Sequence, residues 1–241
     1  MKHQTIQILS FICTSSLHAA TVLLTDKFNT PSYGASTFNS YIAADQAGSL
    51  ATISYTTSAP GGDWSTQHSN GDALLIANAA GNNWVSLNHD FSADPTATNP
   101  TLVIQFDAWV DGGASYSWLG FGIGPAQGAD FYSQPYGINF PQSAGTHNYK
   151  FVISDTVGTG TAFNGITNGA NVALYIDSVY QSTSTKTLNS GGGHITFKQD
   201  QWDGYSVGHV DNLSVSIVPE PGATLLGGLG MLYLLRRRRS R

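Results

Sequence analysis

A strict alternation of apolar and other residues between Thr101 and Val110 constrains the fold more than any other feature of this sequence. One set of alternate positions is entirely apolar: Leu102, Ile104, Phe106, Ala108 and Val110. The positions between them include Gln105, Asp107 and Trp109. A period of two is the pattern of a β-strand with one buried face. The chain is therefore expected to form a sheet whose core lies against one side of this strand.

Further strand candidates recur along the chain and are separated by Gly-rich clusters such as Asp111-Gly112-Gly113. We expect strands at 22–28, 50–57, 73–78, 84–89, 118–123, 149–154, 171–179, 194–198 and 209–218. No convincing amphipathic helix is visible between them. About ten short strands in one domain predict an all-β fold in which two antiparallel sheets pack as a jelly-roll sandwich.

The charge of the middle of the chain excludes one class of function. Residues Ala20 to Val218 contain fourteen Asp and four Lys but no Arg or Glu, a net charge of −10, whereas the whole chain carries −5. Nucleic-acid binding needs a basic face that neutralises phosphates, so no nucleic-acid partner is expected. The single cysteine, Cys13, leaves the domain without a disulfide or a cysteine-based metal site.

The first 19 residues have the pattern of a secretory signal peptide. A basic start at Lys2 precedes a modestly apolar stretch from Ile6 to Leu17, and the small residues Ala19 and Ala20 follow. This predicts export through the secretion machinery, with a signal peptide at 1–19 and a β-sandwich domain at 20–217. An uncleaved first strand is the alternative.

The C-terminal residues 218–241 have three ordered elements. Pro219, Glu220 and Pro221 come first, an uncharged and mostly apolar run at 222–235 follows, and an arginine cluster ends the chain: Arg236, Arg237, Arg238, Arg239 and Arg241. A helix of fourteen residues is about 21 Å long, which is short for a hydrocarbon core of about 30 Å. The arginines would keep the C-terminus cytoplasmic and the domain outside.

This tail resembles the PEP-CTERM sorting signal of Gram-negative bacteria. The resemblance implies that an exosortase, a membrane enzyme, recognises Pro219-Glu220-Pro221 as a substrate motif and releases the domain to the cell surface or the extracellular matrix. The tail is then a short transmembrane helix that holds the protein in the inner membrane only transiently. A permanent C-terminal anchor with a Pro-rich hinge is the alternative.

The strands of the middle domain carry a second resemblance. Leu24-Thr25-Asp26-Lys27-Phe28, Val172-Ala173-Leu174-Tyr175-Ile176-Asp177 and His209-Val210-Asp211-Asn212-Leu213-Ser214-Val215 look like strands of concanavalin A-like or laminin-G-like modules. Galactose-binding-like jelly rolls end on a similar strand. The resemblance implies an antiparallel two-sheet sandwich.

Aromatic side chains beside Asp and Asn make sugar binding the function with most physical support. Sugars present apolar C–H faces and hydroxyl edges, so their sites combine exposed aromatics with carboxylates and amides. The candidate glycan-binding residues are Trp109, Trp202 and Tyr205. A structural Ca²⁺ is a candidate cofactor because Asp200, Asp203 and Asp211 supply the oxygen ligands that this ion prefers.

Catalysis has little support in this sequence. Retaining glycosidases need two carboxyl groups close together, and the domain contains no Glu. Asp107 and Asp111 would lie on the same side of their strand if it extended that far, but Asp111-Gly112-Gly113 is typical of a turn. We therefore expect a non-enzymatic, exported glycan-binding or adhesion module associated with polysaccharide. A structural matrix protein without a specific ligand and an unusual polysaccharide hydrolase remain the alternatives.

Overall fold

The computed structural model of the chain describes residues 20–28, 46–57, 63–67, 72–77, 83–96, 99–111, 117–124, 138–139, 145–155, 170–186, 193–201 and 206–219. These residues belong to one compact unit, Ala20–Glu220. No helix among them is long and apolar enough to cross a membrane. The predicted signal peptide and the tail from Glu220 onward lie outside the described residues.

Thirteen strands and one 3₁₀ turn make up the described secondary structure. Strands β1 to β7 are Thr21–Asp26, Tyr55–Thr57, Asp63–Gln67, Asp72–Ala77, Asn83–Leu87, Thr101–Asp111 and Ser117–Gly124. Strands β8 to β13 are Ile138–Asn139, His147–Asp155, Ala170–Ile176, Val179–Lys186, His194–Gln201 and Ser206–Val218, and the turn η1 is Phe91–Ala93.

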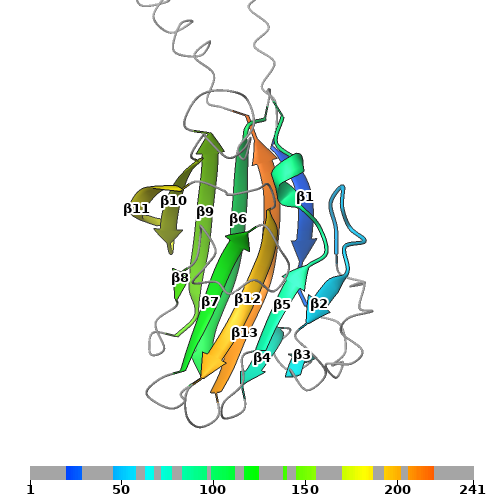
Figure 1. Cartoon of the computed structure of the whole chain (residues 1–241), viewed down its shortest axis with the longest axis vertical. Helices are drawn as coiled ribbons and strands as arrows, with labels where there is room; N and C mark the ends of the chain where they lie inside the picture. The colour runs from blue at the N-terminus through cyan, green and yellow to red at the C-terminus, as the bar shows by residue number, and fades with distance from the viewer. Residues whose placement is uncertain are drawn as a thin grey trace, which may run out of the picture. The chain divides into compact units, whose positions relative to one another are not determined.

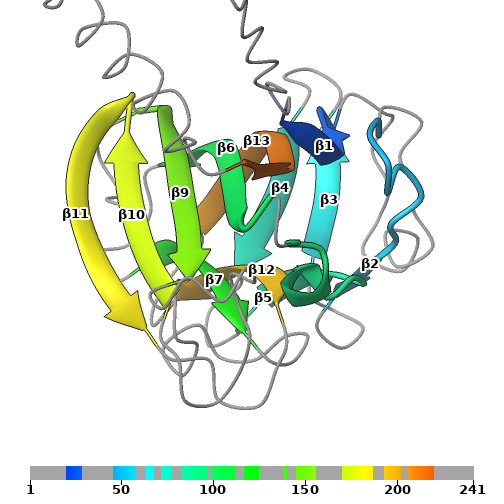
Figure 2. The same ribbon diagram turned by 90° about the horizontal axis from the view of Figure 1, so that it is seen from above.

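The strands form two antiparallel sheets that pack face to face (Figure 1). The larger sheet has eight strands in the order β11-β10-β9-β6-β13-β4-β3, with β1 also paired to β13. The smaller sheet has the order β2-β5-β12-β7-β8. Figure 2 shows β7, β12 and β5 lying beneath the larger sheet. The predicted all-β fold with two packed antiparallel sheets is thus confirmed.

The long strand β13 organises the middle of the larger sheet. Its partner on one side is β6, whereas its other side pairs first with β4 and then with β1. The register with β6 shifts between Asp211 and Ser214, and Asn212 adopts a positive φ of 51° there. Such a β-bulge bends a strand and re-aims its side chains. This bulge lies on the outer face, opposite Asp107 of β6.

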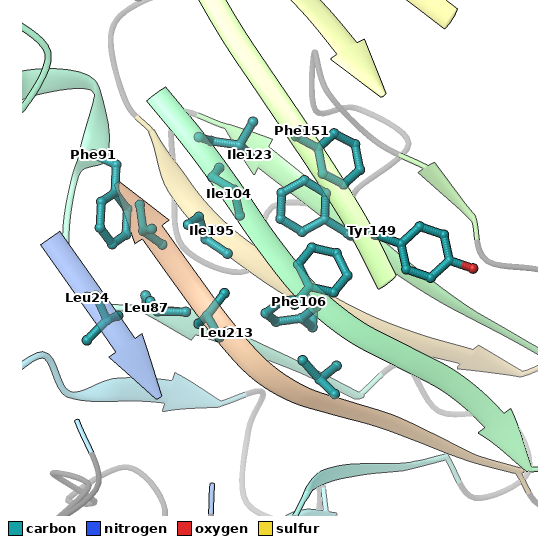
Figure 3. Close-up of a cluster of buried hydrophobic side chains, with 14 of the residues drawn as sticks. Leu24, Leu87, Phe91, Ile104, Phe106, Ile123, Tyr149, Phe151, Ile195 and Leu213 are labelled. Atoms are coloured by element: carbon teal, nitrogen blue, oxygen red, sulfur yellow. The ribbon is translucent and has the colours of Figure 1, made fainter. Parts of the chain in front are cut away.

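The core lies between the two sheets and is rich in aromatic rings (Figure 3). Phe106 of β6 is fully buried, with its ring centroid 5.0 Å from that of Phe121 in β7 and 4.9 Å from that of Phe197 in β12. Its neighbours Ile104 and Ala108 are buried as well. The predicted alternation of β6 is therefore confirmed, because all residues of its apolar set are buried.

The expected strand at 50–57 is corrected to the short β2. The preceding residues instead turn back against β1, where the N–H of Leu50 donates to the carbonyl of Leu23 at 2.8 Å. Gly48 has a φ of +114°, and a Cβ there would lie 2.5 Å from the Leu23 oxygen, so only glycine fits. The buried carboxylate of Asp26 accepts from the Tyr55 hydroxyl at 2.6 Å, which fastens the segment to β1.

The expected strand at 171–179 is also corrected, because it is two strands joined by a hairpin. Strand β10 ends at Ile176, and Asp177 and Ser178 both have positive φ values, 50° and 67°. Two left-handed residues are typical of the type I′ turn, whose twist matches that of the flanking strands. Strand β11 then continues as the outermost strand of the larger sheet.

Candidate functional site

The two sheets differ in how open their outer faces are. On the smaller sheet, Thr196 and Lys198 alternate with core residues, yet they are 0% and 4% exposed. Ser86 is equally buried there and its hydroxyl lies 2.9 Å from that of Thr196. On the outer face of the larger sheet, by contrast, the described residues of β6, β9 and β10 are half-buried. Among the described residues, this outer face is therefore the more open of the two.

An aromatic platform lies on this outer face at the end of β6. Trp109 is half-buried and stacks on His209 of β13, with ring centroids 4.5 Å apart and planes 9° from parallel. His209 itself is only 3% exposed. Strand β9 begins at His147, which pairs with Ala108, so Trp109 lies one position beyond that pairing. The indole is thus supported by the imidazole on one side and lies past the end of β9 on the other.

A network of carboxylate and amide groups lies beside the platform. The Asp107 carboxylate accepts from Asn148 Nδ2 at 2.7 Å and from Asn212 Nδ2 at 2.8 Å. Gln105 Nε2 donates to Asn148 Oδ1 at 2.9 Å. The groups come from β6, β9 and β13, and each holds the next in a fixed orientation. Groups fixed in this way can recognise hydroxyls without first paying the entropy of ordering.

The predicted site residues fall at different places. Trp109 lies on the polar face of its strand, as expected. Trp202, Tyr205 and Asp203 lie outside the described residues.

Two of the three predicted calcium ligands lie on strands of different sheets. Asp200 is on β12 of the smaller sheet, whereas Asp211 is on β13 of the larger sheet, facing Asp107 in register. Asp211 accepts hydrogen bonds from the N–H and the side-chain amide of Asn212, at 2.6 and 3.0 Å. Among the described residues no group of three or more metal-binding side chains comes together. A calcium role for these residues stays a prediction.

A second polar contact fixes the β10–β11 hairpin to the start of β9. The Asp177 carboxylate lies 2.6 Å from His147 Nδ1 and accepts from the Asn148 N–H at 2.9 Å. The hydrogen bond from Asn148, followed by that from His147, holds the pKa of Asp177 below its ordinary value. Burial, and then the negative charge of Asp177, raise the pKa of Tyr149 to about 12. This contact positions Asn148 for its bond to Asp107.

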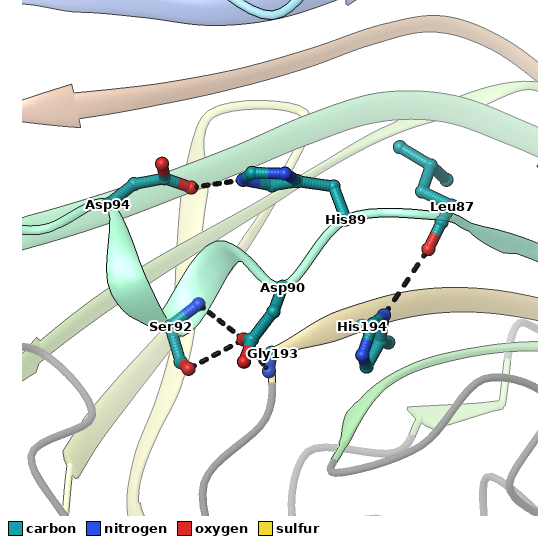
Figure 4. Close-up of polar contacts among 7 residues, drawn as sticks. All are labelled: Leu87, His89, Asp90, Ser92, Asp94, Gly193 and His194. Atoms are coloured by element: carbon teal, nitrogen blue, oxygen red, sulfur yellow. Dashed lines mark hydrogen bonds and ion pairs between the residues drawn. The ribbon is translucent and has the colours of Figure 1, made fainter. Parts of the chain in front are cut away.

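A third polar cluster joins the turn η1 to the start of β12 (Figure 4). The Asp90 carboxylate accepts from the N–H groups of Ser92 and Gly193 at 2.9 and 2.5 Å. Burial pushes the pKa of Asp90 up, but the bonds from Ser92 and Gly193 and the charge of His194 outweigh it and lower that pKa. A Cβ at Gly193 would lie 2.6 Å from the Ser92 nitrogen, so the two segments touch. We interpret this cluster as structural, because it holds the turn η1 against the start of β12.

Comparisons with known proteins identify no family. No protein-family model matches the chain, and no curated protein matches its sequence. Among solved structures, it is similar to the alginate lyase Aly36B (12% identity, 81% of this chain, 96% of that one, TM-score 0.45). It is also similar to the Emp47p carbohydrate recognition domain (8% identity, 83% of this chain, 97% of that one, TM-score 0.49). A sialidase matches over 67% of this chain at 11% identity and a TM-score of 0.43, but the match spans only 16% of the sialidase.

The sequence predicted the outward position of Trp109 but not the residues that surround it. Asn148 and Asn212 lie 41 and 105 residues from their partner Asp107, so no local pattern connects them. His209 was visible only as the start of the last expected strand. The arrangement joins a flat apolar ring to fixed carboxylate and amide groups, which is suited to holding a polyhydroxyl ligand.

Proposed function

We propose that this chain is an exported, non-catalytic glycan-binding module whose binding site is the outer face of the larger sheet around Trp109. The observation that carries the proposal is the half-buried Trp109 stacked on His209, beside the Asp107–Asn148–Asn212 network. The jelly-roll, concanavalin A-like architecture expected from the sequence is part of the same proposal.

The chemistry of sugars explains why this arrangement suits them. The axial C–H groups of a pyranose ring form an apolar face that packs on an aromatic ring, and its hydroxyls bond to carboxylates and amides. The imidazole stacked on the indole holds that ring in place without a ligand, so little conformational entropy is lost on binding. Asp107 can accept from a sugar hydroxyl, and Asn148 and Asn212 keep its carboxylate aimed outward.

A polysaccharide pull-down with the full-length chain tests the proposal. The protein is kept in a detergent without a sugar headgroup, because such a headgroup would compete for the site. Retention is measured on a panel of neutral and acidic polysaccharides, with Ca²⁺ and with a chelator. We expect saturable retention, and loss of about 2 kcal/mol of affinity, roughly 30-fold, in Trp109→Ala, as for a central aromatic contact.

Trp84→Ala is the matched control, because Trp84 is a half-buried tryptophan on β5 of the other sheet. Binding that survives both substitutions would overturn the assignment of the site. No retention by the wild-type chain on any polysaccharide would favour a structural matrix protein. Turnover of a bound glycan that disappears in Asp107→Asn would favour a hydrolase.

Delivery to the cell surface is the other part of the proposal. Residues 218–241 act as an exosortase-type sorting tail, with Pro219-Glu220-Pro221 as the recognition motif and the arginine cluster as the cytoplasmic stop. Mass spectrometry of surface material tests this directly. Peptides from the domain should be present, and peptides containing Tyr233 to Arg236 should be absent. Recovery of the latter would instead indicate a permanent anchor.

A further inference from the structure

A second aromatic pair lies on the same outer face, at the edge of the larger sheet. Tyr175 of β10 faces Lys150 of β9 in register, and Lys150 faces Gln105 of β6. Gln105, Asp107 and Trp109 are alternate residues on one side of β6, so the Tyr175 position belongs to the same face. Tyr180 of β11 faces Tyr175 and completes the pair. Figure 2 shows β6, β9, β10 and β11 side by side in this order.

The tyrosine pair is held in place and yet open to solvent. The two rings meet edge to face, with centroids 5.6 Å apart, and the Lys150 ammonium lies 5.7 Å from the Tyr175 centroid. The Tyr180 hydroxyl donates to Thr183 Oγ1 at 3.0 Å. Tyr180 is nevertheless 55% exposed, one of three exposed large hydrophobic residues among the described side chains. A fixed and exposed ring is a second surface for the apolar face of a sugar.

The spacing of the two platforms sets the length of the ligand. Tyr175 lies at the level of Gln105, two strands across from β6 and four residues along from Trp109. With about 4.8 Å between strands and 3.3 Å per residue, the two positions are roughly 16 Å apart. One sugar ring cannot bridge that distance. The polar side chains of Asp107, Asn148 and Lys150 lie between the two platforms.

The charges on this face set the charge of the ligand. Asp107 and Asp211 face each other in register, and the ammonium of Lys150 lies at the Tyr175 ring. The surrounding domain, Ala20 to Val218, carries fourteen Asp against four Lys. A uronate or sulfated chain would meet two carboxylates against one ammonium, so net repulsion costs affinity, whereas a neutral chain is not repelled.

We infer that Tyr175 and Tyr180 form a second subsite, and that the ligand is an extended, uncharged polysaccharide laid across β6, β9, β10 and β11 from Trp109 to Tyr180. This inference rests on the proposed glycan-binding function and adds the length and the charge of the ligand. Because the two contacts belong to one chain of sugars, the second acts as an intramolecular contact and raises affinity without a second ligand.

Oligosaccharide ladders test the second subsite. Titration calorimetry of the full-length chain uses gluco-, manno- and xylo-oligosaccharides from one to eight units. For a ladder that binds, we expect affinity to rise at least tenfold between the shortest ligand that binds and the longest. Tyr180→Ala should reduce the long ligands to the affinity of the short ones and leave the short ones unchanged. Val179→Ala, the exposed neighbour of Tyr180, is the matched control and should change neither.

Each outcome separates the inference from the proposed function. Equal affinity for all lengths, or a Tyr180→Ala variant that behaves as wild type, would overturn the second subsite while Trp109→Ala still reports on the first. A polyuronate that binds more tightly than its carboxyl-reduced form would overturn the inferred charge selectivity. If no oligosaccharide or polysaccharide of any kind binds, the proposed function fails and the inference fails with it.

Discussion

Two aromatic residues of β6 should serve different purposes, one in the stability of the fold and one in ligand binding. Two alanine substitutions can measure this difference. Phe106 faces the core and is fully buried, whereas Trp109 lies on the outer face and is half-buried. Replacing a buried phenylalanine with alanine typically costs about 3–5 kcal/mol, from lost burial and from the cavity that remains. Phe106 contacts rings from both sheets, including Phe121 and Phe197, so the cavity would open at the sandwich interface.

For a domain of this size, 1 kcal/mol corresponds to roughly 2–4 °C in Tm, so Phe106→Ala should lower Tm by roughly 6–20 °C. Trp109→Ala loses the stacked contact with His209, worth about 0.5–1.5 kcal/mol beyond the buried area of the ring. The half-buried indole leaves no enclosed cavity, so the total cost should stay below that of Phe106→Ala. Urea denaturation and thermal melts of both variants give the free energies, and the glycan pull-down gives the binding. Phe106→Ala should be unstable but bind at low temperature, whereas Trp109→Ala should be stable but bind roughly 30-fold more weakly. A Trp109→Ala variant as unstable as Phe106→Ala would refute the distinction between the two faces.

Three further predictions concern the supports of the fold. Gly48→Ala should destabilise the domain by more than about 2 kcal/mol in urea denaturation, because it adds a clash with the Leu23 carbonyl to the strain of a positive φ. Gly145→Ala is the control: it has a φ of +76° and open space around it, so it should show only the strain. The raised pKa of Tyr149, about 12, means that its contribution to stability is present below pH 10 and is lost as the pH rises toward 12. A Tyr149→Phe variant should therefore lose less stability than wild type over that alkaline range. The lowered pKa of Asp90 acts in the opposite direction. Its contribution to stability is present above the pKa of an unfolded Asp and is lost as the pH falls through the pKa of the folded state. When the urea midpoint is plotted against pH, Asp90→Asn should therefore show a smaller decrease at acid pH than wild type.

The parts of the fold that the sequence predicted are those with a strong local pattern. The alternation at 101–110 and the apolar face of 209–218 are both central strands of the larger sheet, where one face is buried and the period of two is complete. Strand β11 was missed because its side chains at 179–184 are all exposed, so the core imposes no alternation on it. The turn at Asp177-Ser178 was missed because Ser178 stands where the Asp-Gly pair typical of a type I′ turn has glycine.

The candidate site likewise has one part that the sequence predicted and another part that it did not. The position of Trp109 follows from counting along one strand, and the structure confirms that it lies away from the core. The residues that make it a platform come from other strands: His209 stacks from β13, and Asn148 and Asn212 reach Asp107 from β9 and β13. Such contacts depend on strand order and register, which a single sequence does not encode in any local pattern.

The outer face of the larger sheet also shows where the chain departs from what stability alone would favour. Near the β1 end of β13, Ser214 and Ser216 face Gln105 and Val103, which are ordinary residues for a half-exposed sheet. Toward the β4 end, three unusual features meet within a few residues. Asp107 faces Asp211, and like charges directly opposite each other are destabilising.

The other two features lie beside that pair. Asn212 holds a positive φ, which asparagine adopts more readily than most residues. The imidazole of His209 is buried and stacked on the Trp109 indole, on the face of the sheet away from the core. Proteins commonly depart from local structural preferences at functional sites, and the departures here lie around the Trp109 ring. The concentration of these features at Trp109, and not at the serine end of the same strand pair, favours a binding role for this end of the sheet.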